Sequence, residues 1–274
     1  MAKPIHFDTS YQTFIGAPRL QDHGLHSASM VSLWGLFDGD DYSHISYDAC
    51  RRVANHPTWW SGRESDMIVL DCEVIPLHAS SRTERDAAHD QLIEAVKIYR
   101  EAHPGNAIGY YSELPQLDFY GSLGNCGHQM WVHYKPHYEN WVRNNKQFMY
   151  NYDDNIRTNN KGLAAVVDRV FPSVYPNAAH KYWSDWMQWW KVVLDGNVEQ
   201  AEQYQKPIYA YLSPQWDGRG EYLQPGRWKQ MLEYTLDNKS VDGVVVYQSV
   251  AVGTVFDSSA AWWKETLEVR NAKD

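Results

Sequence analysis

Short runs of apolar residues alternate along the chain with longer polar segments of helical character. Seven of these runs predict β-strands, at residues 4–8, 30–37, 67–74, 107–112, 169–175, 207–212 and 243–249. Most of the runs are continuously apolar, a pattern typical of strands that are covered on both faces. A parallel sheet surrounded by helices meets that requirement.

The polar segments between these strands predict helices, at residues 46–55, 83–102, 138–150, 181–190, 196–204, 227–237 and 260–269. In the clearest of them Leu92, Val96 and Tyr99 recur at helical spacing. Strands that alternate with helices favour a parallel sheet, either doubly wound or closed as a barrel. No glycine-rich nucleotide-binding motif follows any strand. We therefore expect an α/β fold with a single (β/α) barrel of the TIM type, irregular if only the seven recognisable strands form it.

The domain organisation is expected to be simple. The chain has no internal repeat, low-complexity tract or linker rich in proline, glycine and serine, so we expect one domain over residues 1–274. Residues 115–136 are irregular and rich in glycine and aromatic residues, which predicts a long loop over the mouth of the barrel.

The charge balance excludes several classes of partner. The chain carries 25 Lys and Arg against 34 Asp and Glu, a formal net charge of −9, which argues against nucleic acid, anionic membranes and polyanionic ligands. The three cysteines are too few for a disulfide framework. Neither a leader sequence nor an apolar run of membrane-spanning length is visible. We expect a cytoplasmic protein, or one that is released by cell lysis like some phage enzymes, and the oligomeric state stays open.

Aromatic residues are unusually frequent. Thirteen Trp, 19 Tyr and seven Phe make up 14% of the chain. Rings with a polar edge suit surfaces that are half wet and half apolar, including sugar-binding clefts. A tryptophan-rich core or an oligomer interface is the alternative explanation.

Two acids end one of the most apolar strands. Asp71 and Glu73 follow the run Met67–Leu70, and residues two apart in a strand point to the same side. If Leu70 and Cys72 face the helices, both acids face the barrel interior, with Cα atoms roughly 6.5 Å apart. Like charges at that distance raise the pKa of one acid and keep it protonated near neutral pH. Alternatively, the strand ends at Leu70 and both acids cap a loop.

Five short motifs resemble those of the hyaluronidase-type glycoside hydrolases, in the same order. Residues 69–73 (VLDCE) resemble that family's strand-end D-x-E, and residues 108–111 (IGYY) its W-G-Y-Y strand. Residues 171–175 (FPSVY) are similar to its F-P-S-I/V-Y strand, and residues 207–211 (PIYAY) to its P-V-Y-x-Y strand. Residues 243–247 (GVVVY) correspond to its G-V-V-x-W strand.

The resemblance implies an irregular β/α barrel that cleaves glycans containing N-acetylhexosamine. It implies that Glu73 is the general acid/base and that Asp71 orients the acetamido group of the substrate, whose carbonyl acts as the nucleophile. Tyr175 would bind the acetamido oxygen, and Tyr247 stands where the family usually has Trp. The net charge of −9 favours a neutral or cationic glycan over hyaluronan.

Other residues complete the expected site. Glu113 follows the next strand and is either a second carboxylate across the cleft or a loop cap before Pro115. We expect further sugar contacts from Trp34, Tyr111, Tyr211, Trp216, Tyr247 and Gln248. The residues Trp183, Trp186 and Trp190 share one helical face, which either stacks on sugars or packs on the barrel.

Two other functional classes remain open, and no cofactor or metal is expected. A barrel that binds a glycan without cleaving it would keep the aromatic residues and could lose Glu73. Asp38 and Asp40 form a D-x-D pair of the kind that holds a metal–nucleotide complex in glycosyltransferases, although a solvated acidic turn is commoner. The cluster of Cys126, His128, His133 and His137 has no standard zinc spacing.

Overall fold

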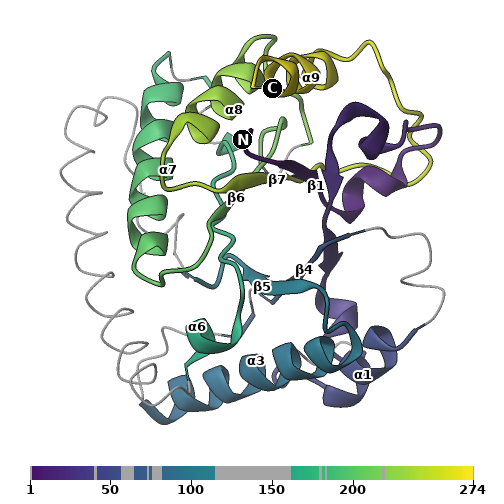
Figure 1. Cartoon of the computed structure of the whole chain (residues 1–274), viewed down its shortest axis with the longest axis vertical. Coiled ribbons are helices and arrows are strands. Elements are labelled where there is room, and N and C mark those ends of the chain that lie inside the picture. The colour runs from purple at the N-terminus through teal and green to yellow at the C-terminus, as the bar shows by residue number, and fades with distance from the viewer. Residues whose placement is uncertain are drawn as a thin grey trace.

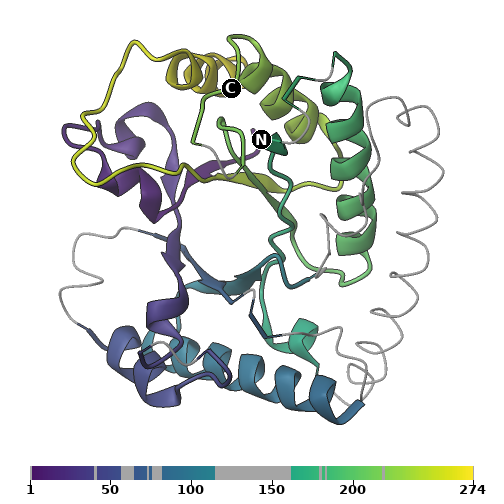
Figure 2. The same cartoon turned by 180° about the vertical axis from the view of Figure 1, so that it is seen from behind.

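The computed structural model describes residues 2–39, 42–56, 65–72, 74–75, 82–114, 162–178, 181–182, 184–217 and 220–273. Within them the fold is mixed α/β, with parallel strands at the centre and helices around them (Figure 1). The view from behind in Figure 2 shows the same arrangement, with the helices again outside the strands.

The described strands form two parallel sheets. They are β1 (Ile5–Phe7), β2 (His26–Ser27), β3 (Ser29–Val31), β4 (Met67–Asp71), β5 (Ala107–Tyr111), β6 (Tyr209–Leu212) and β7 (Gly243–Val246). One sheet has the order β2-β1-β7-β6, and the other has the order β3-β4-β5. All strand pairs are parallel, as the sequence predicted.

Two segments link the sheets. Residues 26–31 pair with β1 through β2 and with β4 through β3, and between them the Ala28 N–H donates to the Phe7 carbonyl at 2.7 Å. On the opposite side, residues 170–173 lie between β5 and β6, through the parallel bridges Tyr111↔Phe171 and Ser173↔Tyr211.

The predicted strand at residues 169–175 is replaced by these isolated bridges. Pro172 has no N–H to donate, so a regular ladder cannot run through it. Its carbonyl still accepts from the Tyr211 N–H at 2.9 Å, and the Val174 N–H donates to the Tyr211 carbonyl at 3.0 Å. The segment therefore keeps its place between two strands without being a continuous strand.

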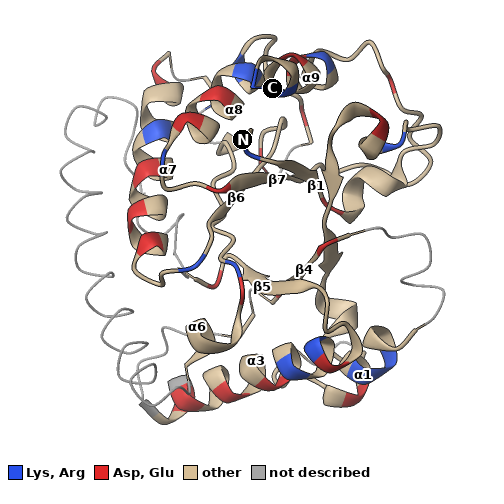
Figure 3. Cartoon of the chain, in the orientation of Figure 1, with Lys and Arg blue, Asp and Glu red and all other residues tan. Residues whose placement is uncertain are grey.

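Helices cover the outside of the strands. The α-helices are α1 (Tyr47–Ala54), α3 (Arg82–Ala102), α6 (Leu163–Val166), α7 (Trp186–Glu202), α8 (Arg227–Asp237) and α9 (Ala261–Ala272). The short 3-10 helices are η1 (Thr9–Thr13), η2 (Leu20–His23) and η3 (Leu33–Gly35). Figure 3 shows charged residues along α1, α3, α7, α8 and α9, as expected for helices with one face toward water.

Five predicted elements differ from the structure or fall outside it. The strand predicted at 30–37 stops at Val31, and η3 follows it. The helices predicted at 181–190 and 196–204 overlap one continuous helix, α7, which runs through Gly196. The cost of a helical glycine, about 1 kcal/mol, is offset by buried neighbours such as Val193 and Val198. The predicted helix at 138–150 and the predicted loop at 115–136 lie outside the described residues.

Alternate residues of the strands form a core of their own inside the strand layer. Its buried members are Ala28, Met67, Val69, Tyr111, Phe171, Tyr209, Tyr211 and Val245. The residues between them, such as Ile68 and Leu70, belong to a larger cluster that includes the helices. The continuously apolar strands are explained by this covering on both faces.

Gly109 allows β5 to approach the 170–173 segment. A Cβ at this position would lie 2.2 Å from the Arg169 carbonyl oxygen and 2.7 Å from the ring of Phe171. No side chain fits there, so the inner ring of Phe171 takes the space that a residue on β5 would otherwise fill.

Most of the described tryptophans belong to the core. Those with at most 8% exposure are Trp186, Trp189, Trp190, Trp216, Trp228, Trp262 and Trp263. Among the described tryptophans, Trp34 is the exception at 45%. In this part of the chain the tryptophan content therefore reflects packing more than sugar binding.

Candidate functional site

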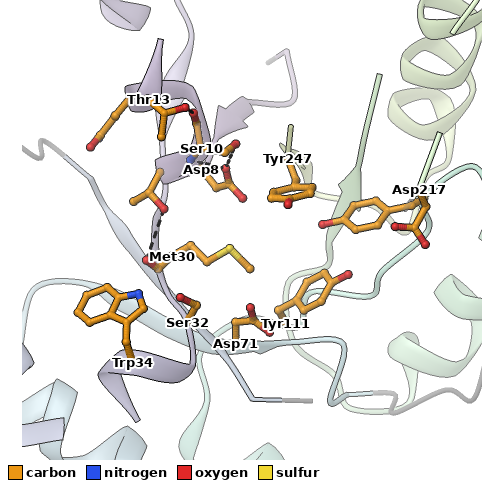
Figure 4. Close-up of a pocket in the computed structure, with 13 residues that line it drawn as sticks. Asp8, Ser10, Thr13, Met30, Ser32, Trp34, Asp71, Tyr111, Asp217 and Tyr247 are labelled. Carbon is orange, nitrogen blue, oxygen red and sulfur yellow. Dashed lines mark hydrogen bonds between the residues drawn. The ribbon is translucent and has the colours of Figure 1, made fainter. Parts of the chain in front are cut away.

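A pocket of about 710 Å³ opens where the parallel strands end (Figure 4). The residues that line it are Asp8, Thr9, Ser10, Gln12, Thr13, Met30, Ser32, Trp34, Asp71, Tyr111, Tyr175, Asp217 and Tyr247. Asp8 follows β1, Asp71 ends β4, Tyr111 ends β5 and Tyr247 follows β7. The carboxyl ends of strands are the side on which β/α-barrel enzymes carry their active sites.

The alternation of β4 directs Asp71 into the pocket. Met67 and Val69 belong to the inner cluster, while Leu70 and Cys72 are buried among the helices. Asp71 continues the inner series by two residues and is only partly buried. The strand includes Asp71, so the alternative that it ends at Leu70 is wrong.

Three tyrosine rings form a row along one wall of the pocket. Tyr111 and Tyr175 stack with ring centroids 5.9 Å apart, and Tyr175 and Tyr247 stack at 5.6 Å. The hydroxyls of Tyr111 and Ser173 are hydrogen-bonded at 2.7 Å. Burial holds the pKa of Tyr175 well above its usual range, and the neighbouring Tyr111 raises it further. The row therefore presents neutral hydroxyls and ring surface, which suits the polar edges and apolar faces of a sugar.

Asp8 is the pocket residue that the sequence analysis missed. Its side chain is buried, and its Oδ1 accepts hydrogen bonds from the N–H of Ser10 at 2.9 Å and the Oγ of Ser10 at 2.5 Å. Its Oδ2 is buried and has no hydrogen-bond partner among the described residues. Burial raises the pKa of Asp8 to about 7; the charge of Asp71 adds to the rise, while the bonds from Ser10 oppose it.

Asp8 is tied to the end of β7 through Ser10. The N–H of Gln248 donates to the Ser10 Oγ at 3.0 Å, and that Oγ donates to Asp8. Gln248 is 1% exposed and does not line the pocket, and its side-chain oxygen and nitrogen have no partner among the described residues. Gln248, which was expected to contact the sugar, therefore supports the site through its backbone N–H.

The remaining predicted residues have separate places. Glu73 lies outside the described residues, as do Asp40 and Trp183. Trp34 lines the pocket. Tyr211 is buried beneath the pocket, with its ring 4.9 Å from that of Tyr111. Burial and the charges of Asp8 and Asp71 raise its pKa.

Glu113 is not brought to the pocket. It is fully buried, and it follows Ser112, whose φ of 57° interrupts the alternation of β5. After burial itself, the charge of Glu113 is among the causes that raise the pKa of Cys72 and of Tyr110. Both of these residues belong to the cluster packed against the helices. Glu113 thus lies toward the helix side of the strand layer.

Trp216 lines a second, smaller pocket. This pocket of about 400 Å³ also contains Trp186, whose ring meets that of Trp216 edge to face at 4.7 Å. Trp190 is fully buried, with its Nε1 donating to the Val174 carbonyl at 2.8 Å. Of the two alternatives for this helix face, packing on the strand layer is the one that Trp190 adopts. The next residue after Trp216, Asp217, faces the large pocket.

The described acids offer no evident metal site. Asp38 accepts hydrogen bonds from Ser46 and, at 2.8 Å, from Arg52, and these bonds lower its pKa. No group of His, Cys, Asp and Glu among the described residues could hold a metal ion. The cysteine–histidine cluster at residues 126–137 lies outside the described part. Among the helices that the structure describes, none has the length and apolar composition that crossing a membrane requires.

Solved structures share this fold. No protein-family model matches the chain, and no curated protein matches it in sequence. The hyaluronidase of bee venom aligns with a TM-score of 0.57 and 13% identity, over 98% of this chain and 96% of that chain. A glucosidase from Croceicoccus marinus aligns with a TM-score of 0.50 and 10% identity, over 93% of this chain and 52% of that chain, so this chain spans about half its length. At such identities the likeness is one of fold alone, a mixed α/β fold with parallel strands, and it does not assign the chain to the hyaluronidase-type family.

Proposed function

We propose that this protein is a glycoside hydrolase that cleaves a polysaccharide or glycan in the large pocket, on a single irregular (β/α) barrel. The observation that carries the proposal is the pocket itself. Carboxyl groups and a row of three tyrosine rings meet there, at the carboxyl ends of parallel strands. Cleavage of a glycosidic bond needs carboxyl groups beside the bond and surfaces that hold a sugar ring.

The fold supports the same reaction class. The aligned structures are a hyaluronidase and a glucosidase, and the first covers almost the whole of this chain. Fold alone does not fix function, because one barrel architecture serves many reactions. The proposal therefore depends on the carboxyl groups, and the fold adds support.

Glu73 is the proposed general acid/base, and Asp71 is its orienting partner. Glu73 follows Asp71 by two residues, and the resemblance to the hyaluronidase D-x-E motif assigns it the proton transfer. On an N-acetylated sugar the acetamido carbonyl attacks the anomeric carbon while Glu73 protonates the leaving oxygen. Glu73 then takes a proton from the water that opens the cyclic intermediate, and the configuration is retained. Asp71 holds the acetamido group during the attack.

The pocket favours a neutral or cationic glycan. Asp8, Asp71 and Asp217 line it, and none of its described lining residues is Lys, Arg or His. The whole chain carries a formal charge of −9. An anionic polymer such as hyaluronan would meet like charge both at a distance and at the site.

Product release from a panel of neutral, N-acetylated and acidic polysaccharides tests the proposal. Wild type is assayed beside Glu73→Gln, which removes the proton but keeps the shape. The matched control is Glu101→Gln, the same change at an exposed position on α3. We expect wild type and the control to release the same reducing ends from a neutral or N-acetylated glycan. Glu73→Gln loses at least ~10²-fold in kcat, the usual worth of a general acid.

Equal cleavage by wild type and Glu73→Gln would show that Glu73 is not the general acid/base. If no glycan is cleaved but one binds both proteins equally, the chain is a glycan-binding barrel and the hydrolase proposal fails.

A further inference from the structure

We propose that Asp8 is a second carboxyl group of the reaction pocket, which acts as a neutral acid and donates a hydrogen bond from Oδ2 to an oxygen of the bound sugar beside Asp71. The inference rests on the proposed hydrolase function and adds to it a residue outside the D-x-E motif. Figure 4 shows the carboxyl groups of Asp8 and Asp71 directed toward the same space.

The hydrogen bonds of Asp8 leave one oxygen for the pocket. Oδ1 receives both bonds from Ser10, through the backbone N–H and through Oγ. Oδ2 has no partner among the described residues, although the side chain is only 1% exposed. Buried polar atoms are nearly always paired, and an exception in a pocket indicates a role with a ligand. Since Ser10 occupies Oδ1 as a donor, a proton on the carboxyl group belongs on Oδ2.

The groups that face Asp8 favour its neutral form. Asp71 faces it from β4 and raises its pKa further after burial has done so. The phenols of Tyr175, Tyr211 and Tyr247 face it from three other segments, and the charge of Asp8 is among the causes that raise the pKa of each, after burial. No Lys, Arg or His is present in the described lining to stabilise a second negative charge. Protonation of Asp8 therefore avoids a second buried negative charge beside Asp71.

The neutral form has a defined use. A carboxylic acid that stays protonated donates a strong hydrogen bond to a sugar hydroxyl or acetamido oxygen, which a carboxylate cannot do. When Asp8 ionises, that donor is lost and two negative charges share the pocket. We therefore expect kcat/KM to fall as the pH rises through about 7, the pKa of Asp8.

The pH profile of kcat/KM separates Asp8 from Glu73, which must also be protonated to act. Asp8→Asn keeps a neutral donor, and we expect an active enzyme that has lost the ionisation near pH 7 due to Asp8 and keeps only the alkaline limb set by Glu73. Ser10→Ala removes a bond that stabilises ionised Asp8, so the pKa of Asp8 rises and the alkaline limb moves to higher pH. Ser259→Ala is the matched control, because Ser259 binds Asp257 through the same two donors outside the pocket, and it leaves the limb in place.

A direct titration gives a readout that does not need activity. Carboxyl-carbon NMR of protein labelled at aspartate should show one resonance with a midpoint near 7, which is absent in Asp8→Asn and shifted upward in Ser10→Ala. Melting temperatures of the variants are recorded alongside, because Ser10 also accepts the Gln248 N–H.

The outcomes distinguish this inference from the proposed function. If Asp8 titrates near pH 4, or if the alkaline limb is the same in wild type, Asp8→Asn and Ser10→Ala, the inference is overturned while the hydrolase proposal stands. If Asp8 titrates near 7 but no glycan is cleaved, the hydrolase proposal fails, and with it the role of Asp8 toward a sugar. An alkaline limb of kcat/KM near pH 7 that moves to higher pH in Ser10→Ala and is absent in Asp8→Asn supports both the role of Asp8 and the hydrolase proposal.

Discussion

Asp8 and Asp257 make the same local hydrogen bonds, yet their pKa values move in opposite directions. In each case the serine two residues later donates its N–H and its Oγ to Oδ1. The bonds from Ser259 lower the pKa of the exposed Asp257, whereas burial raises the pKa of Asp8 to about 7 despite its bonds from Ser10. Burial of the carboxyl group, and not the local hydrogen-bond pattern, therefore decides whether its pKa is raised or lowered.

The raised pKa of Asp8 leads us to expect a specific pH dependence of stability. Its pKa is about 7 in the folded chain against 3.8 for a free carboxyl group, so the folded state binds more protons between these values. The free energy of unfolding falls as the pH rises through this window, by up to ~4 kcal/mol for a shift of this size. Asp8→Asn cannot ionise, so we expect it to exceed wild type in stability at pH 8 and to match it near pH 4.

Urea denaturation of both proteins at several pH values measures this difference. Asp257→Asn is the control, and because the pKa of Asp257 is lowered, the change should cost some stability at neutral pH and none in strong acid. A wild type that is as stable as Asp8→Asn at pH 8 would show that Asp8 has an ordinary pKa.

The Tyr175 hydroxyl is expected to distinguish N-acetylated sugars from others. Tyr175→Phe keeps the ring stacks with Tyr111 and Tyr247 but removes the hydroxyl. A lost neutral hydrogen bond costs about 1 kcal/mol, so kcat/KM on an N-acetylated glycan should fall between ~5-fold and ~10-fold. A substrate without the acetamido group should be cleaved as before, which parallel kinetics on the two substrates will show.

Tyr110→Phe is the control for that experiment. Tyr110 precedes Tyr111 on β5, faces the helices and donates to the Leu92 carbonyl at 3.0 Å. Its loss should lower stability by about 1 kcal/mol without changing the preference between substrates. An equal loss on both substrates in Tyr175→Phe would argue against a contact with the acetamido group.

Gly109 is expected to tolerate no side chain. Gly109→Ala places a Cβ against the Arg169 carbonyl and the ring of Phe171, where neither can move freely. We expect a loss of about 3 kcal/mol in unfolding free energy, the upper range for overpacking. Gly105→Ala, four residues earlier and with nothing within 4 Å of its Cβ, should stay close to wild type in the same denaturation measurement. Equal stability of the two variants would contradict this packing.

The strands and the position of Asp71 could be predicted from the sequence. Continuous apolar runs identified β4 and β5, and the period of two placed Asp71 on the inner side with Val69. The bridged segment around Pro172 was predicted as a strand from its apolar residues, although the proline already indicated a missing N–H donor. The strands and the inward side of Asp71 were predictable because each depends only on the order of residues within one segment.

Asp8 could not be recognised in the same way. It directly follows β1, whereas Asp71 is the last residue of β4, so its place at a strand end was a usable signal, but no motif marks it. Its burial and its raised pKa come from contacts with segments far away in the chain, including β4 and β6. The high tryptophan content pointed to sugar-binding surfaces for the same reason: composition does not show that Trp190 and Trp228 are inside the core.

The most direct test of the account is the activity of Asp71→Asn on the glycan that wild type cleaves. Asp71 is a described residue of the pocket, and its replacement keeps the size of the side chain while removing the charge. Asp48→Asn, at an exposed position on α1, is the matched control. We predict that kcat/KM of Asp71→Asn falls at least ~10²-fold with an unchanged melting temperature, while the control keeps full activity. Full activity of Asp71→Asn would show that the glycan is not cleaved in this pocket.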